Sequence, residues 1–421
     1  MSPSPLTVAV IGAGAVGAST ALRLALDGHA VTVFERDPSG ARASFGNAGH
    51  IGAASVVPWA NPVNRRGAMG YRRDPLHPLR FSNADMVRHG RWVARWLAAS
   101  SARRAEAGAH HLKALLDQCF PPLNALLDAA GARDLLRQDG LLHVFASEAS
   151  WQGAAPGFDQ RERLGIPVER LKPGELGDLE PALAFAEAEE RIARAVLLPT
   201  VGQILNPHSL VERYLAALET RGGVVRQGAV SAIVPTEGAV RVETDGGATT
   251  FDRVVIAAGV ASAQLAKPLG ATVPLIAERG YHLQFSSRGD LLRRSVLYVD
   301  SRVVFSPMND GIRMTTGAEF TRPDAPPAFE AMDRIFKAAR PLLPDLPPHE
   351  EAVPWVGSRP SSPDSMPVIG RTPRSDLVLC AYGHGHSGLT MAAPTAMVVA
   401  DLIAGRPPSV DLGPYAPGRG I

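Results

Sequence analysis

Residues 7–17 read TVAVIGAGAVG, an apolar run that ends in a Gly-x-Gly-x-x-Gly turn. The run predicts a buried strand, and the alanine-rich segment that follows it predicts a helix. In a dinucleotide-binding βαβ unit, Gly12 permits the tight turn, Gly14 lets the backbone approach a pyrophosphate, and Gly17 lets the helix pack close to the sheet. The helix would begin with unpaired N–H groups directed at phosphate oxygens. The stretch therefore predicts a dinucleotide site.

A second strand and an acidic residue follow at the positions that such a unit requires. The helix is predicted from about Ala15 to Asp27, and the apolar residues 30–34 predict a strand that ends at Glu35. A carboxylate about 20 residues after the glycine turn accepts the hydroxyl groups of an adenosine ribose. A glycine-rich turn without a ligand would explain the glycines but not this ordered set.

Length, charge and cysteine content bound the remaining possibilities. A chain of 421 residues is too long for one ordinary core, so two or three domains are expected. The formal net charge of +2 does not suggest nucleic acid as a partner. Cys119 and Cys380 form neither a disulfide framework nor a metal-binding pattern, which favours a reduced, cytoplasmic setting and no metal site. No signal peptide and no apolar run long enough to span a membrane is visible in the sequence.

The region from Asn61 to Arg104 is strongly basic. Its ten arginines are opposed only by Asp74 and Asp85. Two interpretations stay open: a solvated helix face, or a basic patch that meets acidic lipid headgroups or an electron-accepting partner. Ser82 and Asp85 have capping-box spacing before a predicted helix.

The rest of the chain alternates between helical and extended patterns. Further helices are predicted around His110–Cys119 and Leu123–Ala130, with Pro121-Pro122 as the break between them. The region from Pro274 to about Pro354 begins with alternating apolar residues, which predict an antiparallel sheet with one covered face. Near the C-terminus, a strand over Leu377–Ala381 leads into a glycine-rich loop and a helix of small residues.

Taken in order, these stretches resemble the D-amino-acid oxidase-like family of FAD oxidoreductases. The resemblance covers nearly the whole chain and is closest to the bacterial D-amino-acid dehydrogenases (small subunit) and to the hydroxyproline, glycine and sarcosine oxidase-type members. The segments that carry it are the glycine turn with Glu35, GNAGH at 46–50, VVIAAG at 254–259, GSRP at 357–360, DSMPVIG at 364–370, GHGHSGLT at 383–390 and PYAPGR at 414–419.

The resemblance implies an α/β fold with two interleaved domains. One is a Rossmann-like FAD-binding domain, and the other is an α+β substrate-binding domain built on an antiparallel sheet. The implied FAD-binding domain comprises residues 1–58, 171–262 and 356–421, and the implied substrate-binding domain comprises residues 59–170 and 263–355.

The resemblance also implies which residues hold FAD. The pyrophosphate would lie at the first helix, the flavin under the Gly46–Gly49 loop, and the adenine beside Val230. A helix start at about Leu389 would stabilise negative charge on the reduced flavin. This second glycine-rich loop with its helix start favours FAD over NAD. The implied FAD contacts are Gly12, Gly14, Ala15, Val16, Gly17, Glu35, Arg36, Ser44, Asn47, Ala48, Gly49, Val230, Ala258, Gly259, Gly385, His386, Ser387, Gly388, Leu389 and Thr390.

On the substrate side, the resemblance points to Arg359 in the Gly-x-Arg-Pro turn. A planar guanidinium can hold a carboxylate through two parallel hydrogen bonds and so fix the adjacent Cα–H. The alternative is a surface arginine before a proline. Tyr281 would assist carboxylate binding or roof the pocket, or it would only pack. His50, His384 and His386 would flank the flavin, where each either tunes the site or is a structural histidine.

The implied reaction is FAD-dependent oxidation of the Cα–N bond of a D-amino acid, by hydride transfer from Cα to flavin N5. Two departures from the family pattern leave the substrate open: Ser358 is small, and His50 replaces a frequent glutamine. D-Proline and hydroxy-D-proline are therefore included. A glycine/sarcosine-type oxidase, and a flavin-binding partner subunit without amino-acid oxidation of its own, are the alternatives.

The implied electron acceptor is a quinone or oxygen, and no motif distinguishes them. The expected location is cytoplasmic, with peripheral contact to the inner face of the membrane if the basic region meets lipid.

Overall fold

The computed structural model describes residues 4–37, 43–68, 74, 76–77, 79–81, 83–286, 289–321 and 325–420. The predicted βαβ unit forms the middle of a six-stranded sheet. All neighbouring strands in it run parallel except the last pair. Every residue of the first strand after Thr7 is buried, as expected for a strand covered on both faces. In spatial order the strands are β10 (Val224–Gln227), β2 (Ala30–Glu35), β1 (Thr7–Ile11), β14 (Arg253–Ile256), β21 (Ser375–Tyr382) and β20 (Val368–Thr372).

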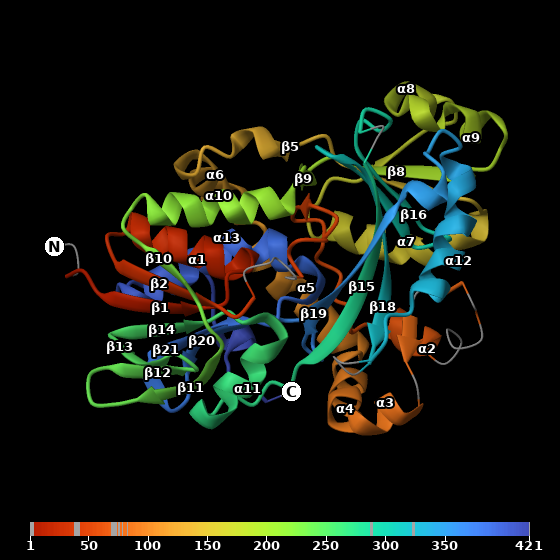
Figure 1. Ribbon diagram of the computed structural model, residues 1–421. Coiled ribbons are helices and arrows are strands. Elements are labelled where there is room, and N and C mark those ends of the chain that lie inside the picture. Colours follow the sequence, from red (N-terminus) through yellow and green to blue (C-terminus); the bar gives the residue numbers. More distant parts are fainter. Residues whose placement is uncertain are drawn as a thin grey trace.

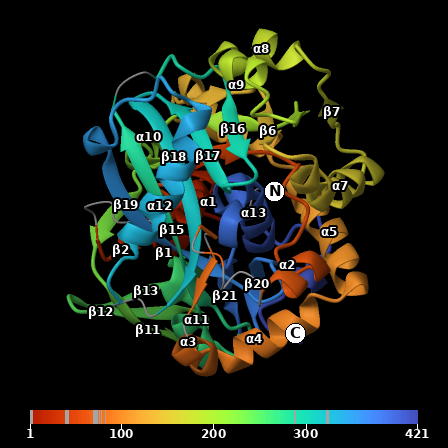
Figure 2. The ribbon, with the colours of Figure 1, turned by 90° about the vertical axis from the view of Figure 1, so that its right-hand side faces the viewer.

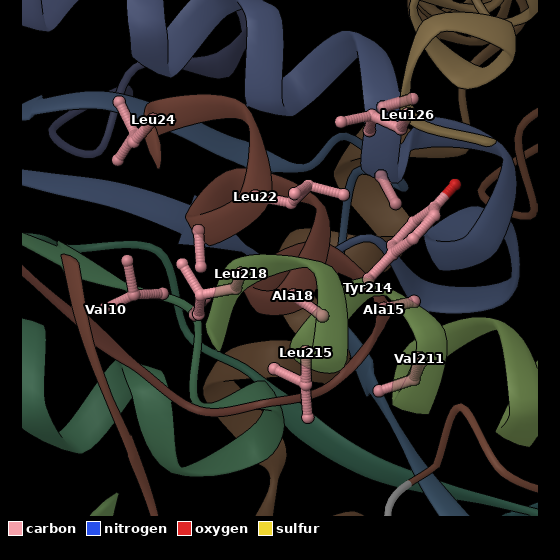
Figure 3. Close-up of a cluster of buried hydrophobic side chains, with 14 of the residues drawn as sticks. Val10, Ala15, Ala18, Leu22, Leu24, Leu126, Val211, Tyr214, Leu215 and Leu218 are labelled. Carbon is pink, nitrogen blue, oxygen red and sulfur yellow. The ribbon is translucent and has the colours of Figure 1, made fainter. Parts of the chain in front are cut away.

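Four helices cover one face of this sheet (Figure 1). Small residues such as Ala15 and Ala18 let the first helix lie close to its neighbours, and leucines and Tyr214 from the surrounding helices fill the space (Figure 3). Asn206 begins one of them, because its side chain accepts a hydrogen bond from the Ser209 N–H. The helices are α1 (Ala15–Leu26), α6 (Phe120–Ala129), α10 (Pro207–Glu219) and α13 (Gly388–Ile403).

A small antiparallel sheet and one short helix lie on the opposite face (Figure 1). Phe34 of β2 meets Phe251 edge-on there, with ring centroids 5.9 Å apart. The elements are β11 (Val230–Pro235), β12 (Val240–Thr244), β13 (Gly247–Phe251) and α11 (Ser262–Ala266).

A nine-stranded sheet forms the second half of the molecule. It is mostly antiparallel, as predicted, with parallel pairing of β6 with β16 and of β4 with β18. Helix α12 (Phe329–Ala339) lies across β17 and β18 (Figure 2). The strands are β19 (Val353–Ser361), β15 (Ile276–Phe285), β18 (Gly311–Phe320), β17 (Val303–Met308), β16 (Ser295–Tyr298), β6 (Leu141–Phe145), β8 (Arg194–Leu198) and β7 (Glu169–Arg170), with β4 (Leu79–Phe81) beside β18.

Shorter elements connect these layers. A three-stranded sheet joins the loop after β2 to the rest of the chain. The basic region contributes three helices and the start of a fourth, although Arg72, Arg73 and Ser82 lie outside the described residues. Within the described residues no helix is long and apolar enough to cross a bilayer. The elements are β3 (His50–Ile51), β9 (Gly202–Ile204), β5 (Leu136–Arg137), α2 (Pro62–Gly67), α3 (Asn83–Arg88), α4 (Gly90–Ala99), α5 (Ala102–Leu116), α7 (Glu148–Arg163), α8 (Glu175–Leu179) and α9 (Ala184–Ala188).

The structure corrects three local predictions. Residues 357–360 form part of strand β19 and not a turn; Pro360 is tolerated because β19 is an edge strand, where a missing N–H costs little. Pro121-Pro122 does not interrupt a helix but lies in the first turn of α6, where proline is favoured. Residues 171–198, expected in the FAD-binding domain, supply β8 to the nine-stranded sheet and α8 and α9 to its core.

Candidate functional site

The glycine turn is held by contacts that leave no room for side chains at two of its three glycines. Gly12 has φ of +102°, and a Cβ there would lie 2.6 Å from the Ala257 carbonyl oxygen. A Cβ on Gly17 would lie 1.9 Å from the Gly12 carbonyl oxygen. Gly14 differs, because its φ is −71° and a Cβ would meet only Ser44 Oγ, at 3.4 Å. The fold therefore requires Gly12 and Gly17, whereas Gly14 keeps the start of α1 open to a ligand.

Polar groups gather at the start of α1. The Ala15 N–H donates to Ser44 Oγ at 2.9 Å, and the Ala13 N–H donates to Glu35 Oε2 at 2.8 Å. The Glu35 carboxylate thus lies directly beside the turn, at the end of β2. Both features fit the anionic and ribose parts of a dinucleotide.

A cavity of about 420 Å³ continues from this point along the ends of β2 and β10. The Gly228 N–H donates to the Glu35 carbonyl oxygen at 2.9 Å, which places the cavity next to Glu35. Val230 begins β11 close by. This space fits the adenosine end of FAD, and its lining residues are Arg36, Gln227, Gly228, Ala229, Asp245 and Gly246.

The loop that was predicted to cover the flavin is braced from within. Asn47 Nδ2 donates to the Ser44 carbonyl oxygen and Asn47 Oδ1 accepts from the Gly49 N–H, both at 2.7 Å. Gly49 has φ of +82°, and a Cβ there would lie 2.3 Å from the Ile204 carbonyl oxygen. Ala48 lies between these two braces, so its backbone is fixed with them.

Three residues that sequence reasoning missed hold this loop against the nine-stranded sheet. The buried Arg313 donates to the Asn47 carbonyl oxygen at 2.8 Å, and burial lowers the pKa of its guanidinium to about 10. His282 Nδ1 lies 2.9 Å from the Gly46 carbonyl oxygen, and its ring stacks on Trp355 with centroids 4.9 Å apart. A Cβ on Gly46 would lie 2.3 Å from the Trp355 ring, so this glycine is required.

The C-terminal glycine-rich loop leads into α13 as predicted, with the helix beginning at Gly388. No side chain caps the start of this helix. Thr390 Oγ1 donates to the His50 carbonyl oxygen at 3.0 Å and joins the helix to β3. Gly385 and Ser387 form a turn of 3-10 helix before Gly388, with Leu389 partly buried against α1 and its neighbours. Ala258 and Gly259 follow β14, next to the glycine turn.

Arg359 lies on β19 opposite Glu278 of β15. Its Nη1 donates to Glu278 Oε1 at 3.1 Å and to the Gly317 carbonyl oxygen at 2.9 Å. The guanidinium lies against the backbone of Gly280, where a Cβ would be 2.1 Å from Arg359 Nη2. Within the described residues Nε and Nη2 have no hydrogen-bond partner. One edge of the guanidinium is therefore fixed and the other can bind a carboxylate.

Glu278 is the buried charge at the centre of this site. Its carboxylate accepts from Arg359 Nη1, from Ser361 Oγ at 2.6 Å and from His386 Nε2. Burial alone would raise the pKa of the Glu278 carboxyl, but its contacts with His386, Arg359 and Ser361 outweigh this effect and lower the pKa to about 2. Glu278 is therefore ionised at neutral pH.

Tyr281 lies on the other face of β15, against α12. Its hydroxyl donates to Glu319 and accepts from the Ala328 N–H at 2.9 Å, and its ring packs edge-on against Phe329. Burial raises the pKa of the Tyr281 hydroxyl to about 12. Of the roles considered for Tyr281, the structure therefore favours packing, away from Arg359.

The three histidines of the predicted site have different surroundings. His384 is buried and its Nε2 lies 3.0 Å from Thr395 Oγ1 of α13, so its ring points into the helix packing. His50 Nε2 is buried without a partner among the described residues, and burial lowers the pKa of His50 to about 4. His386 alone is half-exposed and bound to a carboxylate. The geometry thus favours a structural role for His384.

Buried neutral histidines should make the fold sensitive to acid. Burial lowers the pKa of His143, His282 and His384 to about 3. In the unfolded chain these pKa values return to about 6.5, so the unfolded state binds more protons throughout the intervening range. The free energy of unfolding should be highest above about pH 6.5 and should fall, as the pH drops towards 3, by up to roughly 1.4 kcal/mol per pH unit for each histidine.

Urea unfolding at a series of pH values measures this slope. His110, which is exposed on α5, provides the matched control: His110→Gln should leave the slope unchanged. A free energy of unfolding that stayed constant between about pH 7 and 5 would contradict the prediction.

Comparisons with known proteins show the family of this chain. A family model described as FAD dependent oxidoreductase matches residues 7–402. The chain is 31% identical to a protein named D-amino-acid oxidase from Bradyrhizobium diazoefficiens, with 99% of each chain covered. It is also 31% identical to a D-amino acid dehydrogenase from Paramagnetospirillum magneticum, with 97% of each covered.

Solved structures share the fold over the whole chain. Glycine oxidase from Geobacillus kaustophilus has a TM-score of 0.75 at 24% identity, with 99% of both chains covered. L-Proline dehydrogenase from P. horikoshii has a TM-score of 0.73 at 18% identity, with 99% of this chain and 98% of the other covered. The predicted α/β architecture is therefore confirmed, and the protein is an enzyme of the FAD-dependent oxidoreductase family that uses FAD as its cofactor.

Proposed function

We propose that this enzyme oxidises the Cα–N bond of a D-amino acid to an imine, which water hydrolyses to a 2-oxo acid and ammonia. The observation that carries the proposal is the geometry of Arg359. One edge of its guanidinium is fixed by Glu278 and Gly317, and its Nε and Nη2 are without partners in the described part of the chain. A free guanidinium edge beside the C-terminal cofactor loop suits the carboxylate of an amino acid.

The residues of the chain bind and orient both reactants. The start of α1, Glu35 and the cavity beyond it would hold the adenylate part of FAD, and the start of α13 would face the flavin. Bound FAD supplies the acceptor for the two electrons that leave the substrate. Arg359 would hold the substrate carboxylate in one orientation, so that the Cα–H bond presents a fixed direction to the cofactor.

The preference for a D-amino acid rests on the names of the two relatives described above, each 31% identical. A glycine/sarcosine-type oxidase is the alternative, because a glycine oxidase shares the whole fold. D-Proline also stays among the candidate substrates, although Ser358, which pairs with Arg279, lies on the face of β19 opposite to Arg359.

A substrate panel separates these possibilities. Purified enzyme is assayed with a dye as electron acceptor against D- and L-amino acids, glycine, sarcosine and the hydroxyproline isomers, and the 2-oxo acid product is measured. The proposal expects the highest kcat/KM with a D-amino acid. Higher values for glycine or sarcosine would favour the alternative, and no product from any amino acid would favour a partner subunit.

We also propose that a membrane quinone is the acceptor and that α3 and α4 contact the lipid. Val87 is 83% exposed and Leu97 is 41% exposed, beside the exposed Arg88 and Arg91. Exposed apolar side chains on helices that also carry exposed arginines suit an anionic lipid surface. The enzyme should therefore co-sediment with anionic vesicles at low salt, whereas Val87→Asp should bind less. Equal recovery with neutral and anionic vesicles would contradict this.

A further inference from the structure

The pair formed by Glu278 and His386 lies beside Arg359 and suits the transfer of a proton from the substrate. This inference rests on the proposed function. Glu278 is 2% exposed and its Oε1 is shared by Arg359 Nη1 and His386 Nε2. Ser361 Oγ donates a hydrogen bond to the other carboxylate oxygen of Glu278, Oε2. Two groups bound to one oxygen lie within about two hydrogen-bond lengths, ~6 Å, of each other. The guanidinium that would bind the substrate carboxylate and the imidazole of His386 therefore belong to one site.

Glu278 fixes the orientation of the imidazole. With Nε2 turned to the carboxylate, the neutral ring carries its proton on Nε2, and Nδ1 is left as an acceptor. Nδ1 has no partner within the described residues, and the His386 side chain is 48% exposed. A carboxylate on one nitrogen also stabilises the imidazolium that forms when the other nitrogen takes a proton.

The reaction needs such an acceptor. An amino acid at neutral pH carries an ammonium group, which has no lone pair with which to form an imine. The nitrogen must lose a proton before the Cα–H bond can be cleaved as hydride. Bases near the reaction centre accelerate this kind of step when they lie within reach of the proton.

We propose that His386 accepts the ammonium proton of the bound substrate and that Glu278 is the positioning residue for this transfer. An N–H bond of the substrate breaks, its electron pair stays on the amine nitrogen, and an N–H bond forms at His386 Nδ1. No electrons are exchanged. The imidazolium is then paired with Glu278, while Arg359 keeps the substrate carboxylate.

His384 and His282, which also lie near the cofactor loops, are less suited to this role. His384 is buried with its Nε2 at Thr395, and His282 is buried with Nδ1 at the Gly46 carbonyl oxygen. The charged groups that face His386 are Glu278 from β15 and, across the shared oxygen, Arg359 from β19.

The test is the pH dependence of flavin reduction under anaerobic mixing at saturating D-amino acid. In His386→Gln, the reduction rate at neutral pH should fall at least tenfold and recover at high pH, where the free amine is already neutral. Imidazole added to His386→Ala should restore part of the rate. Glu278→Gln should also slow flavin reduction at neutral pH and recover at high pH, because the imidazole loses the carboxylate that positions it, and KM should rise because Arg359 loses its partner.

Controls separate the possible failures. His110→Gln should behave as wild type, and reduction rates are expressed per bound flavin, so that a change in the FAD content of the His386 variants does not enter them. If Glu278→Gln does not fold, the two His386 variants still show whether His386 accepts the substrate proton. A His386→Gln profile that overlays wild type overturns the inference while leaving the proposed function intact. If no amino acid reduces the wild-type flavin, the proposed function fails first.

Discussion

Arg359→Ala should raise KM for the amino-acid substrate by about 100-fold or more and leave FAD bound. A charge-assisted, two-pronged hydrogen bond to a carboxylate contributes about 3 kcal/mol, and each 1.4 kcal/mol is a factor of ten. The loss falls on substrate binding, because the residues that fit FAD lie on α1, β2 and α13 and not on β19. Steady-state kinetics and the flavin-to-protein ratio of the purified variant measure both halves of this prediction.

Two further variants define what Arg359 contributes. Arg359→Lys keeps the charge but loses the planar fork, so its KM should lie between wild type and Arg359→Ala. Arg241 lies exposed on β12, and Arg241→Ala should change neither KM nor the FAD content. A wild-type KM in Arg359→Ala would show that the carboxylate binds elsewhere.

Gly14→Ala should fold normally and lose at least about tenfold in FAD affinity, about 1.4 kcal/mol. A methyl group at Gly14 meets only Ser44 Oγ, at 3.4 Å, but it stands where a phosphate would approach the start of α1. By contrast, Gly17→Ala places a methyl group 1.9 Å from the Gly12 carbonyl oxygen and should prevent folding of the turn. Titration of the apoprotein with FAD, followed by flavin fluorescence, and thermal unfolding of the apoprotein separate the two effects.

Gly90 provides the matched control for the added methyl group. It lies in α4 with nothing within 4 Å of a Cβ, so Gly90→Ala should bind FAD as wild type does. Wild-type affinity in Gly14→Ala would mean that the cofactor phosphates do not approach this glycine. Failure of Gly14→Ala to fold would mean that the glycine is structural.

The parts of the site that the sequence predicts are those whose residue types are dictated locally. The turn with Gly12 and Gly17, and Glu35 at the next strand end, follow from backbone geometry within one βαβ unit. The helix start at Gly388 is one residue from its predicted place, because the glycine-rich loop before it marks the boundary. Such features need no knowledge of distant contacts.

The parts that the sequence does not reveal depend on strand pairing between distant segments. Successive side chains of β15 point to opposite faces of the sheet. Whether the odd-numbered or the even-numbered residues face Arg359 depends on how β15 pairs with β19. Glu278 lies on the face that Arg359 occupies and Tyr281 on the other, and only the register of β15 with β19 settles this. Arg313 donates a hydrogen bond to the Asn47 loop, although the two residues are more than 260 positions apart in the chain. Nothing in the sequence around either residue indicates this contact.

The division into domains was also beyond local reasoning. Residues 171–198 read as a continuation of the cofactor-binding half, yet β8 of this segment pairs with β6. Strand pairing of this kind is decided by which apolar faces meet in the core, and the sequence pattern alone does not specify the partner.

The most direct test of the central claim, that FAD in this site oxidises an amino acid held by Arg359, is a single anaerobic turnover. Enzyme with bound FAD is mixed with the D-amino acid that is best in the panel, and the visible absorbance of oxidised flavin is followed. We predict bleaching with a rate that saturates with substrate, and one 2-oxo acid and one ammonia formed per flavin reduced. A flavin that stays oxidised with every amino acid in the panel would contradict the claim.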